Sequence, residues 1–600
     1  MKNNMPLSID ELANMNAFEV LWNCSKEHLK EVAIIYKADL NVDNIDKKTI
    51  EKRITYKELF TNILTVYHSL LAEGVKKGDI VTYSSISTPE LIYTAYACVL
   101  LGAIFKPIDI RFNSEELLNQ FKQTPSKIFF GSMPFVDKIL PVHKDLGVKI
   151  IVLFNFEESL PKIVKFASKI QQITTKGGTI KIPDDKIWKN WNQFSLPNYK
   201  NNPIIPSTMT TPNDVIHLTA TTGTTGTPKQ LLHSSSNWNA QLYNASYCGL
   251  EFVRGEKLFN NTVPWVDFGI INVIHTFLCN GITIEMDPLW SAEKNAQFII
   301  KNNPHWWLGA PGWLDDLFTN DKYNNAILSN AKYFITGGAP LFPHKHLEYQ
   351  KKMDIMSNGT GIIVPGYGFS EVSAAASTDL ENKVETIGKM WPLVKYEIRD
   401  YDTGAIVDKG QEGELWITSK DRRISQVAVG YLNNDEENKR IFSTDEDGNK
   451  WARSGDKVVE NDDGTITFIS RYKNILTYNG FNINCDKISE EVLKEKSVIN
   501  AIVIGCNTPD GNQMPIVCVE TGDMSTDNKT ALKSTILSMM SKKFPEYYTP
   551  QDIVFYDKFP TISMKVDIQT IKHTLLDEFG EYKGVASPQD TSKKLKKELN

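Results

Sequence analysis

The stretch that decides the fold is "TATTGTTGTPKQLLH", residues 219–233. The segment before it, "DVIHL" (214–218), is short, apolar and β-branched, which predicts a buried strand with the Thr/Gly run as the loop that leaves it. Gly223 and Gly226 allow positive φ and leave backbone N–H groups uncovered, and Lys229 adds a cation. Four threonines add hydroxyl donors: Thr221, Thr222, Thr224 and Thr225. A loop with these donors suits a chain of phosphates.

Two other interpretations of this loop exist. The nucleotide P-loop pattern G-x-x-x-x-G-K-[ST] does not match, because the fifth position after Gly223 is Pro228. Ser/Thr/Gly runs are also common in solvated linkers, so the run alone leaves that alternative open.

Bulk properties exclude several classes of protein. A chain of 600 residues exceeds one ordinary core, and 41% hydrophobic with 23% charged residues is usual for a globular protein in water. The formal net charge of −6 and the lack of a basic stripe argue against a nucleic-acid partner. The basic C-terminal run "SKKLKKELN" is expected to be a solvated tail.

Cysteine spacing and hydropathy indicate a cytoplasmic protein. The 7 cysteines are scattered with no C-x-x-C pair, which speaks against a disulfide framework and a zinc site. The N-terminus lacks the apolar region of a secretory signal. The longest apolar stretch (91–105) is shorter than the roughly 18 residues of a membrane span, so we expect a buried helix there and no transmembrane segment.

The order of apolar patterns predicts an α/β protein of two domains. Strand and helix patterns alternate from residue 55 to "AIFKPID", which indicates parallel βαβ units, and residues 157–213 read as a surface insertion. Beyond "GQEGELWITS" (410–419) the pieces become shorter and richer in strands. We expect a large N-terminal domain (1–470) and a small α+β C-terminal domain (471–600).

Six short segments follow one another in a characteristic order along residues 50–575. They are "TTGTTGTPK" (221–229), "TGGAPL" (336–341), "GYGFSE" (366–371), "RSGDKV" (453–458), "RYKNILTYNGFNI" (471–483) and "TISMKVD" (561–567). Together they resemble the adenylate-forming (AMP-binding) superfamily, which includes acyl-CoA synthetases, luciferases and the adenylation domains of peptide synthetases. The resemblance implies that the protein activates a carboxylic acid with ATP and Mg²⁺, releases pyrophosphate, and transfers the acyl group to coenzyme A. It implies further that the larger domain has mixed sheets and that the smaller one is mobile.

The resemblance also assigns the nucleotide site. The phosphate loop would wrap the β- and γ-phosphates, with Thr224 taking part in catalysis, and Asp456 would accept hydrogen bonds from the ribose hydroxyls. Arg471 would reach ribose or phosphate. The adenine and α-phosphate would be met by Gly338, Ala339, Pro340, Tyr367, Gly368 and Ser370. Glu371 would be a Mg²⁺ ligand, because this ion takes one or two carboxylates and fills its shell with phosphate oxygens and water.

Two positions bear on the C-terminal domain. By resemblance, Lys565 would bridge the anionic acid and the α-phosphate, although Met564 stands where the family usually has glycine. Asn474 would be the hinge, at a position where the family has aspartate or lysine. Lys487 likewise replaces an expected glutamate.

By the same resemblance, the acyl pocket would be lined by segments 262–272 and 305–313, including Trp265 and Asp267, together with Gly338. Asp267 would face either a polar group of the substrate or solvent. Trp306 and Trp307 would either close the pocket or pack in the core.

Three functions remain open on the sequence. They are an acyl-CoA synthetase, an acyl-adenylate ligase that loads a separate carrier protein, and a degenerate homologue that binds nucleotide without turnover. The acid itself and the oligomeric state are not specified by the sequence.

Overall fold

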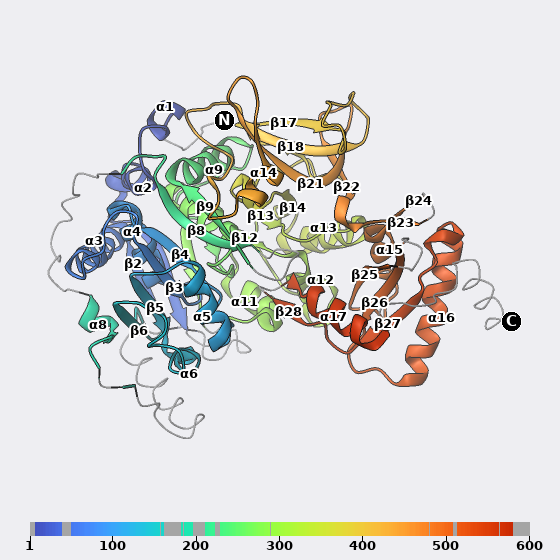
Figure 1. The fold of residues 1–600 in the computed structure, drawn as a ribbon, viewed down its shortest axis with the longest axis horizontal. Helices are drawn as coiled ribbons and strands as arrows, with labels where there is room; N and C mark the ends of the chain where they lie inside the picture. The colour runs from blue at the N-terminus through green and yellow to red at the C-terminus, as the bar shows by residue number, and fades with distance from the viewer. Residues whose placement is uncertain are drawn as a thin grey trace.

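The computed structural model describes the greater part of the chain. The described residues are 7–38, 50–156, 158–160, 182–183, 185–195, 210–221, 228–288, 290–478, 481–507, 513–562 and 565–579. Among them, no helix is long and apolar enough to cross a membrane. The described chain combines helices with parallel and antiparallel sheets, which confirms the predicted α/β class (Figure 1).

One large sheet contains both flanks of the Thr/Gly loop. Its strands run in the order β19 (Gly430–Tyr431), β9 (Lys229–Ser234), β8 (Val215–Thr221), β4 (Ile104–Pro107), β3 (Ile80–Ser84), β5 (Ile128–Ser132), β6 (Ile150–Phe154) and β7 (Trp188–Asn190). The strands from β8 to β7 pair in parallel, whereas β9 pairs antiparallel with β8 and β19. The associated helices are α3 (Tyr56–Ala72), α4 (Pro89–Leu101), α5 (Ser114–Gln123), α6 (Val136–Ile139) and α8 (Trp191–Phe194). The apolar helix at 91–105 is α4, and every one of its residues is buried, as predicted.

A second large sheet carries the motifs "TGGAPL" (336–341) and "GYGFSE" (366–371) at the ends of β13 and β14. Its order is β16 (Lys389–Met390), β15 (Ser377–Thr378), β14 (Ile362–Tyr367), β13 (Tyr333–Thr336), β12 (Trp306–Gly309), β10 (Lys257–Phe259), β11 (Thr283–Met286), β1 (Val32–Ala38) and β2 (Ile50–Thr55). Its helices and those between the sheets are α1 (Ile9–Leu12), α2 (Ala17–Ser25), α9 (Ser235–Tyr247), the π-helix η3 (Phe268–His275), α10 (Thr276–Cys279), α11 (Asn295–Asn302), α12 (Asp315–Thr319) and α13 (Pro343–Ser357).

The tryptophans of β12 belong to the core. Trp306 stacks on Phe252 with 4.7 Å between ring centroids, and Trp307 lies against Phe334. Both indoles are fully buried, on opposite faces of the sheet because side chains alternate along a strand. Of the two interpretations of this pair, core packing is therefore the one that holds.

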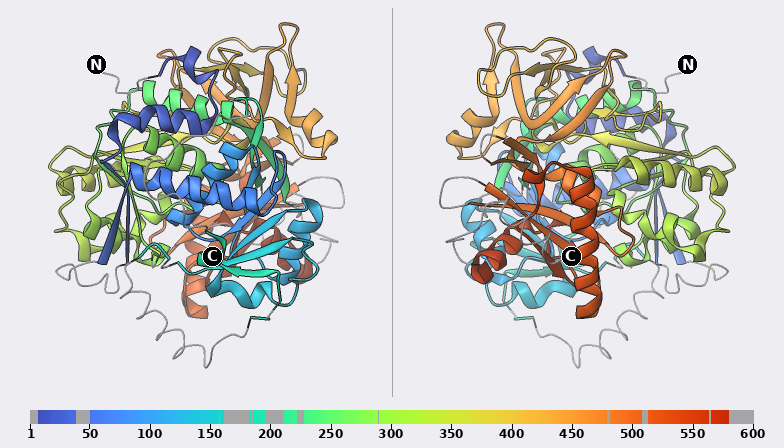
Figure 2. Two further views of the ribbon diagram at one scale, coloured as in Figure 1. Left: turned by 90° about the vertical axis from the view of Figure 1, so that its left-hand side faces the viewer. Right: turned by 90° about the vertical axis from the view of Figure 1, so that its right-hand side faces the viewer.

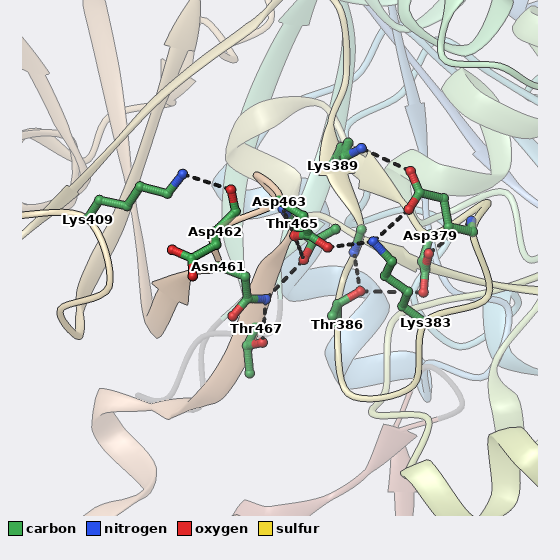
Figure 3. Close-up of polar contacts among 12 residues, drawn as sticks. Asp379, Lys383, Thr386, Lys389, Lys409, Asn461, Asp462, Asp463, Thr465 and Thr467 are labelled. Atoms are coloured by element: carbon green, nitrogen blue, oxygen red, sulfur yellow. Dashed lines mark hydrogen bonds and ion pairs between the residues drawn. The ribbon is translucent and has the colours of Figure 1, made fainter.

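A third sheet lies beside the two larger ones, at the top of Figure 1. It consists of β17 (Val394–Arg399), β18 (Gly413–Ser419), β21 (Lys450–Glu460), β20 (Phe442–Thr444) and β22 (Ile466–Arg471), with α14 (Asp435–Ile441) beside it. The loop 379–389 of the second sheet is tied to the turn between β21 and β22, since Lys383 Nζ lies 2.7 Å from Glu381 Oε2 and 2.5 Å from Asp463 Oδ2 (Figure 3).

The elements after Arg471 form a smaller group at one side of the molecule, coloured orange to red (Figures 1 and 2). They are β23 (Ile475–Tyr478), β24 (Phe481–Asn484), α15 (Cys485–Val492), β25 (Asn500–Asn507), β26 (Gln513–Glu520), α16 (Thr526–Lys543), β27 (Asp552–Tyr556), β28 (Thr561–Ile562), β29 (Lys565–Val566) and α17 (Ile568–Phe579). The strands β25, β26 and β27 make a sheet with its own apolar cluster around Ile488, Val517 and Ile536. The helices α15 and α16 contribute residues to this cluster.

Candidate active site

The strand before the Thr/Gly loop is longer than predicted. The prediction ended the strand at residue 218, but β8 continues to Thr221 because Thr219, Ala220 and Thr221 pair with Leu231, Gln230 and Lys229 of β9. The three residues, two of them β-branched threonines, thus extend an antiparallel hairpin. The predicted ligands Thr222, Gly223, Thr224, Thr225 and Gly226 lie outside the described residues, as does the side chain of Thr221.

Lys229, at the other flank of the loop, forms an ion pair that the sequence interpretation did not include. Its Nζ lies 2.7 Å from Glu437 Oε2, and these side chains are 16% and 9% exposed. Arg440 also binds Glu437, with Nε–Oε2 at 2.9 Å and Nη2–Oε1 at 2.6 Å. The hydrogen bond from Arg440, opposed by burial and aided by Lys229, lowers the pKa of Glu437 below its usual value. Glu437 is therefore a carboxylate that holds the lysine of the loop in one place.

Glu371 lies in the short helix η7 (Ser370–Val372) and accepts a hydrogen bond from the hydroxyl of Tyr431. Burial raises the pKa of the Glu371 carboxyl, and the nearby charges of Asp267 and Glu437 add to that rise. A divalent cation beside phosphates would offset this crowding of negative charge. Among the described residues no group of three or more His, Cys, Asp or Glu could hold a metal.

The turn that carries Glu371 has an unusual backbone. A Cβ on Gly368 would lie 1.7 Å from the carbonyl oxygen of Ala374, so only glycine fits there. Ser373 and Ala374 adopt positive φ values of 63° and 87°, which non-glycine residues seldom do. Such backbone conformations cost about 1–3 kcal/mol each and cluster at functional sites.

Asp456 and Tyr367 bring two distant motifs into contact. The Tyr367 hydroxyl donates to Asp456 Oδ2 at 2.7 Å, and Arg471 Nε lies 3.2 Å from Asp456 Oδ1. Arg471 is the cross-strand neighbour of Asp456 in the pair β21–β22. Burial raises the pKa of Asp456, with the charge of Arg471 and the Tyr367 hydrogen bond acting in the opposite direction.

The turn after β13 lies next to Tyr367 across the sheet. A Cβ on Gly337 would lie 3.3 Å from the carbonyl oxygen of Gly366, the residue before Tyr367. Gly338 has a positive φ of 77° with open space where a side chain would be, and Ala339 and Pro340 are exposed. The small residues thus leave the backbone of this turn open beside the Tyr367 segment.

Asp267 does not face solvent, so one of the two alternatives for it is excluded. Its carboxylate is 2% exposed, with Oδ1 at 2.6 Å from Thr219 Oγ1 and 3.0 Å from His233 Nε2. Burial opposes ionisation, but the His233 charge and hydrogen bonds hold the pKa of Asp267 at about 2. His217 pairs with His233 across β8 and β9, and burial lowers the pKa of His217 to about 3.

Trp265, the other predicted pocket residue, is 6% exposed, and Arg111 lies 5.8 Å from its ring. Its indole N–H has no partner among the residues that the structure describes. The Trp265 side chain therefore combines an apolar ring with a buried N–H donor that has no acceptor among the described residues.

The C-terminal candidates belong to the smaller group of elements that follows β22. Asn474 ends the 3₁₀ turn η8 (Tyr472–Asn474), and its Nδ2 donates to Asp486 Oδ1 at 3.0 Å. Lys565 begins β29 and pairs with Ile562, but its side chain lies outside the described residues.

Sequence reasoning missed three residues that contact predicted site residues. Tyr431 contacts Glu371, Glu437 contacts Lys229 and His233 contacts Asp267. The only signal for His233 was its place on the strand after the loop, level with His217 in an antiparallel hairpin. Tyr431 and Glu437 lie about 200 residues beyond the loop they contact, and nothing in the local sequence indicates that contact.

Comparison with known proteins shows the family of the chain. The family described as "AMP-binding enzyme" matches residues 22–432. The chain is 22% identical over 529 residues to 4-coumarate–CoA ligase-like 8 of Arabidopsis thaliana, covering 86% of both chains. It is 24% identical over 464 residues to a long-chain-fatty-acid–CoA ligase of Bacillus subtilis (strain 168), covering 76% of this chain and 79% of the relative.

Solved structures share the fold. The anthranilate CoA ligase AuaEII in complex with anthranoyl-AMP superposes with a TM-score of 0.74 at 17% identity, covering 96% of this chain and 99% of that one. ATP-bound MatB from Rhodopseudomonas palustris gives a TM-score of 0.72 at 18% identity, covering 94% and 100%. These likenesses confirm the predicted fold.

Proposed function

Since the chain belongs to the AMP-binding enzyme family, we propose that it activates a carboxylic acid with ATP and transfers the acyl group to coenzyme A. The first step would form an acyl-adenylate and pyrophosphate, and the second a thioester. The CoA ligases among the relatives support the choice of acceptor.

The observation that carries the proposal is a set of contacts that links three of the motifs. Asp456 contacts Tyr367, Glu371 follows Tyr367 by four residues, and Tyr431 joins Glu371 to the β9 side of the hairpin. Lys229 lies on that same strand, at the end of the loop. Ribose, metal and phosphate groups would therefore be met within one site, as the three parts of one ATP require.

Within this site, each described side chain would have one task. The Asp456 carboxylate would accept hydrogen bonds from the ribose hydroxyls. It would do so either in place of its contacts with Tyr367 and Arg471 or in addition to them. The Lys229 ammonium, which is paired with Glu437, would also donate to phosphate oxygens, since an ammonium group carries three donors. Glu371 would bind Mg²⁺, which when bound stabilises the negative charge that develops on the phosphates.

The elements after Arg471 would supply one more cation to the site, the ammonium group of Lys565. Lys565 would reach the α-phosphate and the acid together, which lowers the repulsion between two anions; a preorganised donor of this kind is worth about 10²–10³ in rate. Movement about Asn474 would bring it in and take it away. We propose that the boundary of this mobile domain lies at 470/471, just before the last residue of β22.

We place this chemistry in the cytoplasm. All 7 cysteines are free, which agrees with a reducing compartment.

The test is a pyrophosphate-release assay with ATP, Mg²⁺ and a panel of carboxylic acids, followed by mass spectrometry after coenzyme A is added. We expect acid-dependent release and an acyl-CoA product. Release without thioester would favour transfer to a separate carrier protein. ATP binding with no release on any acid would show a homologue without turnover and would overturn the proposal.

A further inference from the structure

Two oxygen atoms near η3 are buried without a hydrogen-bond donor. Asp267 immediately precedes this helix and Asn272 lies within it; the two residues are 2% and 4% exposed. Asp267 Oδ2 and Asn272 Oδ1 have no partner among the described residues. Nearly all buried polar atoms are hydrogen-bonded in folded proteins, so two acceptors left over together require a reason.

The orientation of Asn272 is fixed by its neighbour. Gln241 Nε2 donates to the carbonyl oxygens of Val372 at 3.0 Å and Ala375 at 2.8 Å, so its Oε1 can only accept. Asn272 Nδ2 fills that role at 2.7 Å. Turning the Asn272 amide over would set two oxygens against each other, and therefore its oxygen is the atom that remains without a partner.

The orientation of Asp267 is fixed in the same way. Thr219 and His233 both contact Oδ1, which leaves Oδ2 as the second acceptor. Both partners belong to the hairpin β8–β9, so the carboxylate cannot rotate without breaking contacts to both strands.

The spacing of the two residues along the helix favours the same side for both acceptors. The i→i+5 bonds of a π-helix set residues five apart about one turn above each other, and Asp267 and Asn272 are five apart. π-helical turns are rare and are found mostly at functional sites.

Both residues are anchored to the candidate active site. Asn272 connects through Gln241 to Val372, the residue after Glu371. Asp267 connects to Thr219, three residues before the undescribed part of the phosphate loop, and its charge contributes to the raised pKa of Glu371. A molecule that met both acceptors would thus lie beside the elements that carry Glu371 and the flank of the phosphate loop.

We propose that the acid activated at this site carries a hydrogen-bond-donating substituent, a hydroxyl or an amino group, which Asp267 Oδ2 and Asn272 Oδ1 receive. This inference rests on the proposed function and narrows its substrate class. A plain alkyl chain would leave both oxygens unpaired, and a site built to bind a donor discriminates strongly against an analogue that lacks it.

The experiment compares matched acids by the kcat/KM of pyrophosphate release. Butyrate and benzoate are each measured against their hydroxy and amino derivatives, with palmitate as an apolar acid. We expect at least one substituted acid to exceed its parent by about tenfold or more. Comparing the hydroxy with the amino derivatives shows whether the hydrogen-bond donor of the substrate is a hydroxyl or an amino group.

Variants identify the acceptors. In Asp267→Asn and in Asn272→Leu, the preference for the substituted acid over its parent should fall by about tenfold or more, because an acceptor is lost. The matched control is Asp379→Asn, a buried carboxylate in the loop of Figure 3 that accepts from the Glu381 N–H at 3.1 Å. It should leave the preference unchanged even if it lowers stability.

Three outcomes would contradict the inference. Equal kcat/KM for parent and substituted acids would overturn it, as would an unchanged preference in both site variants, and in either case the proposed function would stand. No release with any acid would overturn the proposed function and this inference with it.

Discussion

The substitution Glu437→Ala distinguishes two effects of the Glu437 carboxylate on ATP binding. One is to position Lys229, the predicted phosphate ligand, and the other is to repel the phosphate. Glu437 holds Lys229 at 2.7 Å, and both side chains are largely shielded from water. Exposed pairs are worth about 0–1 kcal/mol and removing one partner of a buried pair costs about 3–5 kcal/mol. Because this pair lies between those limits and Arg440 shares the carboxylate, we expect a loss of about 1–3 kcal/mol in the free energy of unfolding.

The same change should alter ATP binding. A lysine freed from Glu437 must be immobilised again when it binds phosphate, at a cost of about 0.5–1.5 kcal/mol. We therefore expect the KM for ATP to rise by about 2- to 12-fold with kcat little changed. Steady-state pyrophosphate release gives both constants, and urea unfolding gives the stability.

The control for this substitution is Glu436→Ala, which removes the exposed neighbouring carboxylate in the first turn of α14. It should stay within about 0.5 kcal/mol of the parent protein and keep its KM. A KM for ATP that falls in Glu437→Ala would refute the reasoning, because Glu437 would then compete with phosphate for Lys229 instead of positioning it.

Four further changes have defined outcomes. Tyr431→Phe removes the hydrogen bond to Glu371 and should raise the Mg²⁺ concentration needed for half-maximal activity; an unchanged Mg²⁺ titration would show that the bond has no role in metal binding. Lys565→Ala should slow adenylate formation by about 10²–10³ while thioester formation from a supplied acyl-adenylate continues, and equal losses in both steps would mean that the lysine is misplaced. Gly368→Ala should give little folded protein, because its Cβ would overlap the Ala374 carbonyl, and circular dichroism of the purified variant checks this. Asp267 has a lowered pKa of about 2, so its ionisation stabilises the fold above the unfolded value of about 3.9 and that contribution is lost as pH falls towards 2; in acid titrations Asp267→Asn should show a shallower loss of stability over this range than the parent.

The sequence was most informative where one local pattern determines one element. The alternation that ends in "AIFKPID" predicted α4 and β4. The apolar run at 91–105 was taken as a buried helix, which holds up to Leu101, whereas Ile104 and Phe105 belong to β4. Length is informative there, because a continuous apolar run of more than about 10–12 residues is too long for a typical buried strand.

The sequence was least informative about contacts between distant segments. Lys229 was predicted as a phosphate ligand, but its partner Glu437 belongs to a helix about 200 residues away. The burial of Asp267 likewise depends on a hairpin whose length was underestimated by three residues, because the pairing of Thr219–Thr221 with β9 is decided by the partner strand. Site chemistry could be expected from motifs, whereas the residues that orient it required the fold.

The most direct measurement is isotope exchange between labelled pyrophosphate and ATP in the presence of a carboxylic acid that carries a hydroxyl or an amino substituent. We expect label to enter ATP only when Mg²⁺ and the acid are both present, and Glu371→Gln to suppress the exchange. Exchange that needs no acid, or conversion of ATP to ADP and phosphate, would contradict the formation of an acyl-adenylate at this site.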